Sequence, residues 1–100
     1  MNIYRISQNI NDGYDTYDSA VVCAETEDDA RKIHPSPFTK FWRDNKWFEI
    51  DVNGKEYQSS DGYSSDWVTG DNLKEIKVEY IGVAKDGIEK GVIVSSFNAG

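Results

Sequence analysis

The stretch from residue 18 to residue 35, DSAVVCAETEDDARKIHP, constrains the fold more than any other part of the sequence. Its apolar run, AVVCA, is typical of a central strand that is covered on both faces. Thr26 follows as a helix N-cap, with acidic residues in the first turn and basic residues near the other end. The helix must end before Pro35, because the residue before a proline avoids helical backbone angles. The stretch therefore predicts a buried strand that leads directly into one short helix, at about residues 26–34.

Cys23 and His34, each the only residue of its kind, lie in this stretch and raise the question of a catalytic pair. A thiolate nucleophile requires an exposed cysteine in positively charged surroundings. Cys23 instead lies in the predicted apolar strand, near four carboxylates, and free cysteines are among the most buried residues of proteins. We therefore predict that this corner is structural, that the chain has no catalytic residue and that it is not an enzyme.

Most of the remaining sequence has strand patterns. The opening NIYRISQN predicts a short strand, followed by a turn at Asp12-Gly13. Residues 75–84 (EIKVEYIGVA) and 91–97 (GVIVSSF) predict two closing strands with a turn at KDGIEK between them. The order strand, strand, helix, hairpin, strand, strand predicts a single α+β domain over residues 1–100, with a mostly antiparallel sheet.

The hairpin is predicted at Asn53-Gly54, because this dipeptide is the preferred two-residue turn between antiparallel strands. Folding about it gives an apolar face and a polar face. The apolar face consists of Phe48, Ile50, Val52 and Tyr57, with Ile50 opposite Tyr57. Trp47 falls on the other face, so we expect it to be more exposed than Trp42.

The segment between helix and hairpin is unusually aromatic. PSPFTKFW places Phe38, Phe41 and Trp42 at positions i, i+3 and i+4, which fits one face of a short helix or a cluster of rings in a loop. Both alternatives stay open. Residues 59–73, SSDGYSSDWVTGDNL, predict a polar loop that is interrupted by Trp67 and its neighbour Val68.

The formal net charge of −7 is unevenly distributed. Residues 1–30 carry seven acidic side chains and one basic one, whereas residues 31–55 carry six basic and three acidic ones. An acidic surface disfavours nucleic acids and anionic membranes and favours basic protein surfaces. We therefore expect a protein partner with a basic surface and no nucleic-acid or membrane partner. Asp61 and Asp66, in the acidic segment 56–73, are candidate contacts.

Known metal and phosphate sites do not fit the sequence. A calcium-binding loop needs a glycine at its sixth position and a glutamate at its twelfth, and neither Gly13 nor Gly62 meets the pattern. Zinc needs three or four clustered Cys, His or carboxylate ligands, and one cysteine and one histidine are too few. The eight glycines never form a phosphate-binding loop. We expect no metal and no cofactor. No apolar run approaches the roughly 20 residues that cross a bilayer.

Residues 31–48, RKIHPSPFTKFWRDNKWF, combine five basic with five aromatic side chains. Such a segment can bind single-stranded nucleic acid, can fill the core with its rings, or can form a protein interface, whose hot spots are rich in Trp and Arg. The acidic balance of the chain argues against nucleic acid. We favour an interface, and the core remains the alternative. The candidate anchors are Trp42, Arg43, Trp47 and Trp67.

The stretch YDSAVVCAETEDDARKIHP, together with VEYIGVA and GVIVSSFNAG near the C-terminus, resembles a set of small uncharacterised proteins of bacteria and their phages. The resemblance covers residues 14–35 and 78–100, and the hairpin about Asn53-Gly54 is an insertion relative to the shorter members. It implies a small accessory protein and brings no enzymatic activity or ligand with it.

These observations predict a non-catalytic accessory protein that acts through protein–protein contact in the cytoplasm of a bacterial host. By analogy, an acidic protein of this origin is expected to inhibit a host defence system or a nucleic-acid enzyme. The alternative is a small-ligand protein that binds or sequesters a nucleotide, with the aromatic rings for stacking and Arg31 or Arg43 for the phosphate. The sequence leaves the oligomeric state open.

Overall fold

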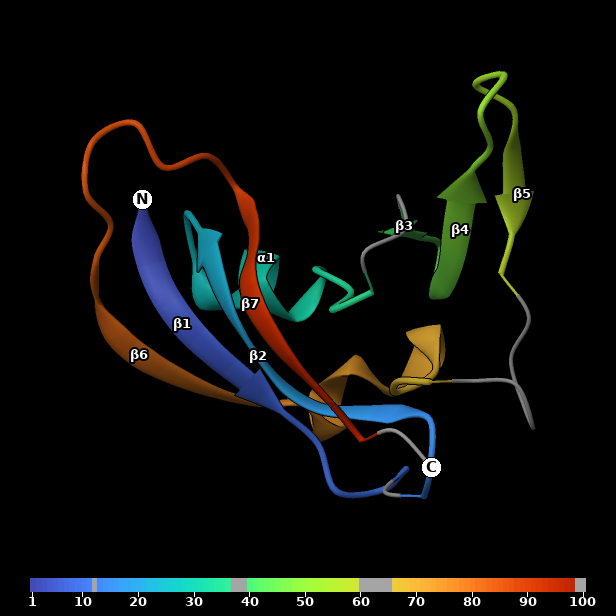
Figure 1. Cartoon of the computed structure of the whole chain (residues 1–100), viewed down its shortest axis with the longest axis horizontal. Helices are drawn as coiled ribbons and strands as arrows, with labels where there is room; N and C mark the ends of the chain where they lie inside the picture. Colours follow the sequence, from blue (N-terminus) through green and yellow to red (C-terminus); the bar gives the residue numbers. More distant parts are fainter. Residues whose placement is uncertain (12, 37–39, 60–65, 99–100) are drawn as a thin grey trace.

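The computed structural model describes residues 1–11, 13–36, 40–59 and 66–98. The chain forms an α+β fold, as predicted, with two antiparallel sheets (Figure 1). No helix in these described residues is long and apolar enough to cross a membrane.

The larger sheet has four strands in the order β6-β1-β2-β7. They are β1 (Asn2–Ser7), β2 (Thr16–Ala24), β6 (Lys77–Val83) and β7 (Gly91–Asn98), and each neighbouring pair is antiparallel. The closing strands β6 and β7 follow one another in sequence but lie at opposite edges of the sheet. Residues 84–90 therefore connect the two edges, and the Ala84 N–H donates to the Met1 carbonyl on the way (2.9 Å).

The strand-to-helix corner has the predicted form. The AVVCA run lies in β2, one of the two central strands, and Cys23 is fully buried there. The helix α1 (Glu27–Arg31) begins with Thr26, whose Oγ1 accepts from the Asp29 N–H at 3.1 Å. It ends at Arg31 rather than near residue 34, because the chain turns there to bury His34 and Pro35. The turn predicted at Asp12-Gly13 begins outside the described residues.

The second sheet contains a strand that was not predicted. It has the order β3-β4-β5, with β3 (Lys40–Arg43), β4 (Lys46–Ile50) and β5 (Glu56–Gln58). The alternatives of a helix or a loop cluster are wrong for Phe41 and Trp42, which lie in β3; Phe38 is outside the described residues. Asp44 and Asn45 form the β3–β4 turn with positive φ of 52° and 63°, as a tight two-residue hairpin turn requires.

The hairpin at Asn53-Gly54 is confirmed, but its predicted register is wrong. Ile50 pairs with Glu56, and Tyr57 faces Glu49 instead. The cause is the Asp51 carboxylate, which accepts from the backbone N–H groups of residues 53 and 55, both at 2.9 Å, and so lengthens the loop. A shift of one residue exchanges the two faces of the sheet. The alternation within β4 is not affected by this shift, and Trp47 still lies on the face opposite Phe48 and Ile50. The Trp47 face of β4 is the one that points into the protein.

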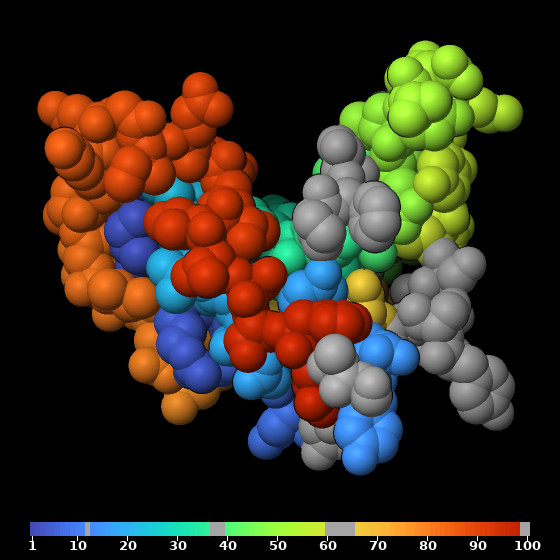
Figure 2. Space-filling view, viewed as in Figure 1, coloured from blue at the N-terminus to red at the C-terminus, as the bar shows by residue number. Residues whose placement is uncertain are grey.

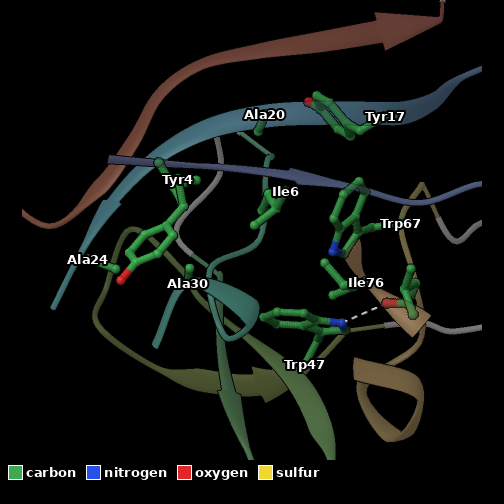
Figure 3. Packing of buried hydrophobic residues seen from close by; sticks show 11 residues of the cluster. Tyr4, Ile6, Tyr17, Ala20, Ala24, Ala30, Trp47, Trp67 and Ile76 are labelled. Carbon is green, nitrogen blue, oxygen red and sulfur yellow. Dashed lines mark hydrogen bonds between the residues drawn. The ribbon is translucent and has the colours of Figure 1, made fainter. Parts of the chain in front are cut away.

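The core lies between the four-stranded sheet and a layer formed by α1, β4 and residues 67–76 (Figure 3). The sheet supplies small and aliphatic side chains together with Tyr4 and Tyr17, and the opposite layer supplies two large indoles. The Trp47 Nε1–H donates to the Val68 carbonyl at 2.8 Å, so the indole is satisfied inside the core. The buried cluster consists of Tyr4, Ile6, Tyr17, Ala20, Val22, Ala24, Ala30, Trp47, Trp67, Val68 and Ile76.

Candidate functional site

A groove lies between β7 and the described residues 32–36 and 40–42. Its volume is about 730 Å³. In Figure 2 it lies at the hollow that separates the lobe of β7 (red) from the lobe of the three-stranded sheet (green). The groove thus joins two segments that are about 50 residues apart in the sequence.

One wall of the groove is the edge strand β7. The strand pairs with β2 on one side, and within the described residues no strand pairs with its other side. Its sequence, GVIVSSFN, contains no charged residue and no proline. The side chains of Ile93 and Val94 are 48% and 58% exposed. The ladder to β2 shifts register here, so Ile93 has no direct partner on that strand. This wall is therefore apolar and has backbone groups available at its edge.

The opposite wall consists of residues 32–36, which follow α1, and of residues 40–42 in β3. Ile33 and Trp42 are partly buried and rest on the core. The Trp42 Nε1–H donates to the Gly70 carbonyl at 2.7 Å, which fixes the indole. The Lys32 ammonium lies over the indole ring, 5.1 Å from its centre. This wall therefore presents an oriented ring with a cation above it.

A polar network supports this wall from within. The Ser36 N–H donates to His34 Nδ1 at 3.0 Å, so the ring proton lies on Nε2, 3.4 Å from Asp66 Oδ1. The Lys40 ammonium is 3.8 Å from the same carboxylate oxygen and 3.3 Å from Glu49 Oε1. Glu49 also accepts from the Tyr57 hydroxyl at 2.6 Å. The network thus connects Asp66 to all three strands of the second sheet, because Lys40 lies in β3, Glu49 in β4 and Tyr57 in β5.

The surroundings of these groups shift their pKa values. Burial lowers the pKa of His34, and the opposing hydrogen bond to Asp66 does not outweigh it. Burial raises the pKa of Asp66, but the hydrogen bond from His34 and the Lys40 charge together hold it below its usual value. The hydrogen bond from Tyr57 lowers the pKa of Glu49, and Lys40 adds to this effect. At neutral pH the network therefore contains a neutral imidazole.

This geometry indicates that the network holds the groove wall in position. Both ring nitrogens of His34 are engaged by the protein itself, and its side chain is buried against Trp47, with ring centres 4.9 Å apart. An imidazole with both nitrogens occupied has none to offer a substrate. Among the described residues, no group of His, Cys, Asp or Glu side chains has the arrangement of a metal site.

The structure separates the four predicted anchors. Trp42 lines the groove, and its role as an interface anchor stays a prediction. Trp47 and Trp67 are only 3% and 1% exposed and belong to the core, so they are not surface anchors. The expectation that Trp47 would be more exposed than Trp42 is wrong. It took the face of Phe48 and Ile50 as the buried face of β4, whereas the opposite face, with Trp47, is buried in the core.

Arg43 lies outside the groove. Its guanidinium carbon is 4.5 Å from the centre of the Phe48 ring and 5.4 Å from that of Phe41. Its Nη1 forms an ion pair with Glu56 at 3.0 Å. The guanidinium of Arg43 therefore has its charge partner and its ring contacts within the second sheet. Of the two acidic candidates, Asp66 belongs to the network behind the groove wall, and Asp61 lies outside the described residues.

Sequence reasoning missed most of the groove. The sequence analysis did not propose Lys32, Lys90 or the β7 edge. A signal was present, because an eight-residue strand without charge or proline lacks the features that protect an edge strand from pairing. His34 was considered only as a catalytic base. Its hydrogen-bond partners come from the fold and leave no pattern in the sequence.

No family model, no curated protein and no solved structure matches this chain. The resemblance to small bacterial and phage proteins therefore stays an expectation, and the argument for function depends on the groove.

Proposed function

We propose that this chain is a non-catalytic protein-binding module and that the groove between β7 and residues 32–36 and 40–42 receives its partner. The observation that carries the proposal is the uncharged edge of β7, with which no further strand pairs among the described residues, in a groove that the oriented Trp42 also lines. A strand edge of this kind promotes association with other chains unless something covers it. A groove with apolar walls and a few charges is typical of a binding site rather than of bare surface.

The sequence favours one form of this function, an accessory protein of bacterial or phage origin that inhibits a host enzyme. The network around His34 supports such a role because it holds the groove wall rigidly, and a rigid wall loses little conformational entropy when a partner binds. The acidic surface supports encounter with a basic partner surface around the groove.

The test is affinity capture from the native host with matched variants. Val94→Glu places a charge on the groove wall, whereas Val52→Glu places the same charge at the fully exposed tip of the β4–β5 hairpin. Both sites are exposed, so both variants should fold with stability within about 0.5 kcal/mol of the parent. We expect a partner that the parent and Val52→Glu retain and that Val94→Glu loses. Equal retention of the partner by all three proteins would show that the groove does not bind it.

A further inference from the structure

We propose that the groove binds an extended, acidic segment of the partner protein, which pairs with the open edge of β7 as a fifth strand of the larger sheet. The inference rests on the proposed protein-binding function and names the chemistry of the partner. Its two parts, strand pairing and negative charge, come from different observations.

The strand geometry comes from β7. An edge strand presents a row of backbone N–H and C=O groups, and an extended peptide uses such a row by adding a strand at about 4.8 Å. Residues 91–95 line the groove, and five residues of a paired strand span about 17 Å. A helical ligand has no free backbone groups to offer this row, because its own turns use them.

The other edge of the sheet lacks these properties. On β6, Lys77 and Glu79 form an ion pair at 3.6 Å, and Glu79 also pairs with Arg5 of β1 at 3.5 Å. Charged side chains are the usual means by which proteins protect an edge from pairing. The chain therefore protects β6 and leaves β7 without charge.

The negative charge of the segment follows from the groove lining. The described lining residues include Lys32, Lys40 and Lys90 and no aspartate or glutamate, in a chain whose net charge is −7. Lys40 is neutralised by Glu49 and Asp66 behind the wall. Among the described residues, no carboxylate lies within ion-pair distance of Lys32 or Lys90. These two ammonium groups are therefore available to carboxylates of a bound segment.

A second copy of this chain fits the groove less well. The β7 strand of another molecule carries no carboxylate for the two lysines. Two copies also repel one another, because each has a net charge of −7. The charges thus favour a foreign acidic segment over self-pairing at neutral pH.

The experiment uses the whole ¹⁵N-labelled chain and a synthetic peptide of alternating valine and threonine with two glutamates at each end. Two matched peptides serve as controls: one has lysines in place of the glutamates, and one has alternate backbone nitrogens methylated. Amide chemical shifts and hydrogen exchange are followed residue by residue. A residue-level readout is needed because the net charge draws the lysine peptide to acidic surfaces elsewhere.

We expect the glutamate peptide to shift the amides of residues 90–95, 32–34 and 36 and to slow hydrogen exchange in β7. At these amides the lysine peptide should bind about tenfold more weakly, and the double variant Lys32→Glu/Lys90→Glu should reverse that order. The methylated peptide should give no protection of β7.

Unchanged β7 amides, equal binding of the two charged peptides, or a β7-paired dimer at neutral pH would overturn the inference. Its failure can be told apart from failure of the proposed function. If Val94→Glu loses a captured partner while that partner leaves the β7 amides of the parent unprotected, the protein-binding function stands and the strand pairing is wrong. If Val94→Glu changes nothing, the function itself fails.

Discussion

Trp42 and Trp47 face one another across the β3–β4 turn, yet only Trp47 is buried in the core. Truncation of a buried tryptophan removes apolar contacts and leaves a cavity, so Trp47→Ala should lower the free energy of unfolding by about 3–5 kcal/mol. It also leaves the Val68 carbonyl without its indole donor. Urea melts followed by circular dichroism measure the change. Val52→Ala, at a fully exposed position of the same hairpin, is the control and should alter stability little. A Trp47→Ala protein as stable as that control would contradict the packing.

His34 should make stability depend on pH. Its pKa is lowered in the folded chain, whereas in the unfolded chain it titrates near its ordinary value of about 6.5. The unfolded chain therefore binds a proton more readily, and the free energy of unfolding should fall as the pH drops below about 6.5. Asp66 and Glu49 have lowered pKa values too, and their contribution is lost only further down, below about pH 4.

The variant His34→Gln isolates this effect, because glutamine does not titrate. Urea melts between pH 7 and pH 5 should show a decline for the parent and a flat profile for the variant, whatever the variant's absolute stability. A decline that persists in His34→Gln would assign the pH dependence to other groups.

At the scale of single elements, the sequence predicted what local interactions determine. The strand-to-helix corner was predictable because the Thr26 cap, the first-turn acids and Pro35 all act within a few residues. The register of the hairpin was not, because one side chain, Asp51, bonds two backbone N–H groups and changes the loop. The strand β3 was missed because its aromatic spacing also fits a helix, and pairing with β4 decides between them.

The contact between the 3₁₀ helix η1 (Gly70–Glu75) and the β3–β4 turn depends on a glycine. A Cβ at Gly70 would lie 2.6 Å from Lys46 Cα and 2.8 Å from the Asn45 carbonyl oxygen, which are both backbone atoms. Gly70→Ala should therefore force the two elements apart and cost roughly 1–3 kcal/mol. It should also weaken the hydrogen bond that Trp42 donates to residue 70.

Thermal melts of Gly70→Ala and Gly13→Ala give the comparison, because a Cβ at Gly13 meets no atom within 4 Å. We expect a clear loss of stability for the first and a small change for the second. Equal melting temperatures would show that the close approach at Gly70 carries no energetic weight.

At the scale of the whole molecule, the groove is a consequence of strand order. Residues 84–90 carry the chain from one edge of the sheet to the other, and this crossover brings the uncharged β7 beside residues 32–36 and 40–42. Neither the order β6-β1-β2-β7 nor the groove is visible in local patterns, because both depend on contacts between distant segments. Sequence reasoning therefore found Trp42, which lies in a conspicuous aromatic segment, and missed the strand that faces it.

Net charge should decide whether the open β7 edge stays free of other copies. At neutral pH the charge of −7 keeps copies apart. As the pH approaches about 4.5, carboxylates begin to take up protons and the repulsion weakens. An uncharged edge strand should then pair with another. We expect light scattering to rise in this range while circular dichroism still reports folded protein.

Val94→Lys should suppress the rise in scattering, because it places a charge on the edge strand itself. Val52→Lys changes the net charge equally at the remote hairpin tip and should suppress it less. Equal suppression by both lysines would assign the association to overall charge and leave β7 without a special part in it.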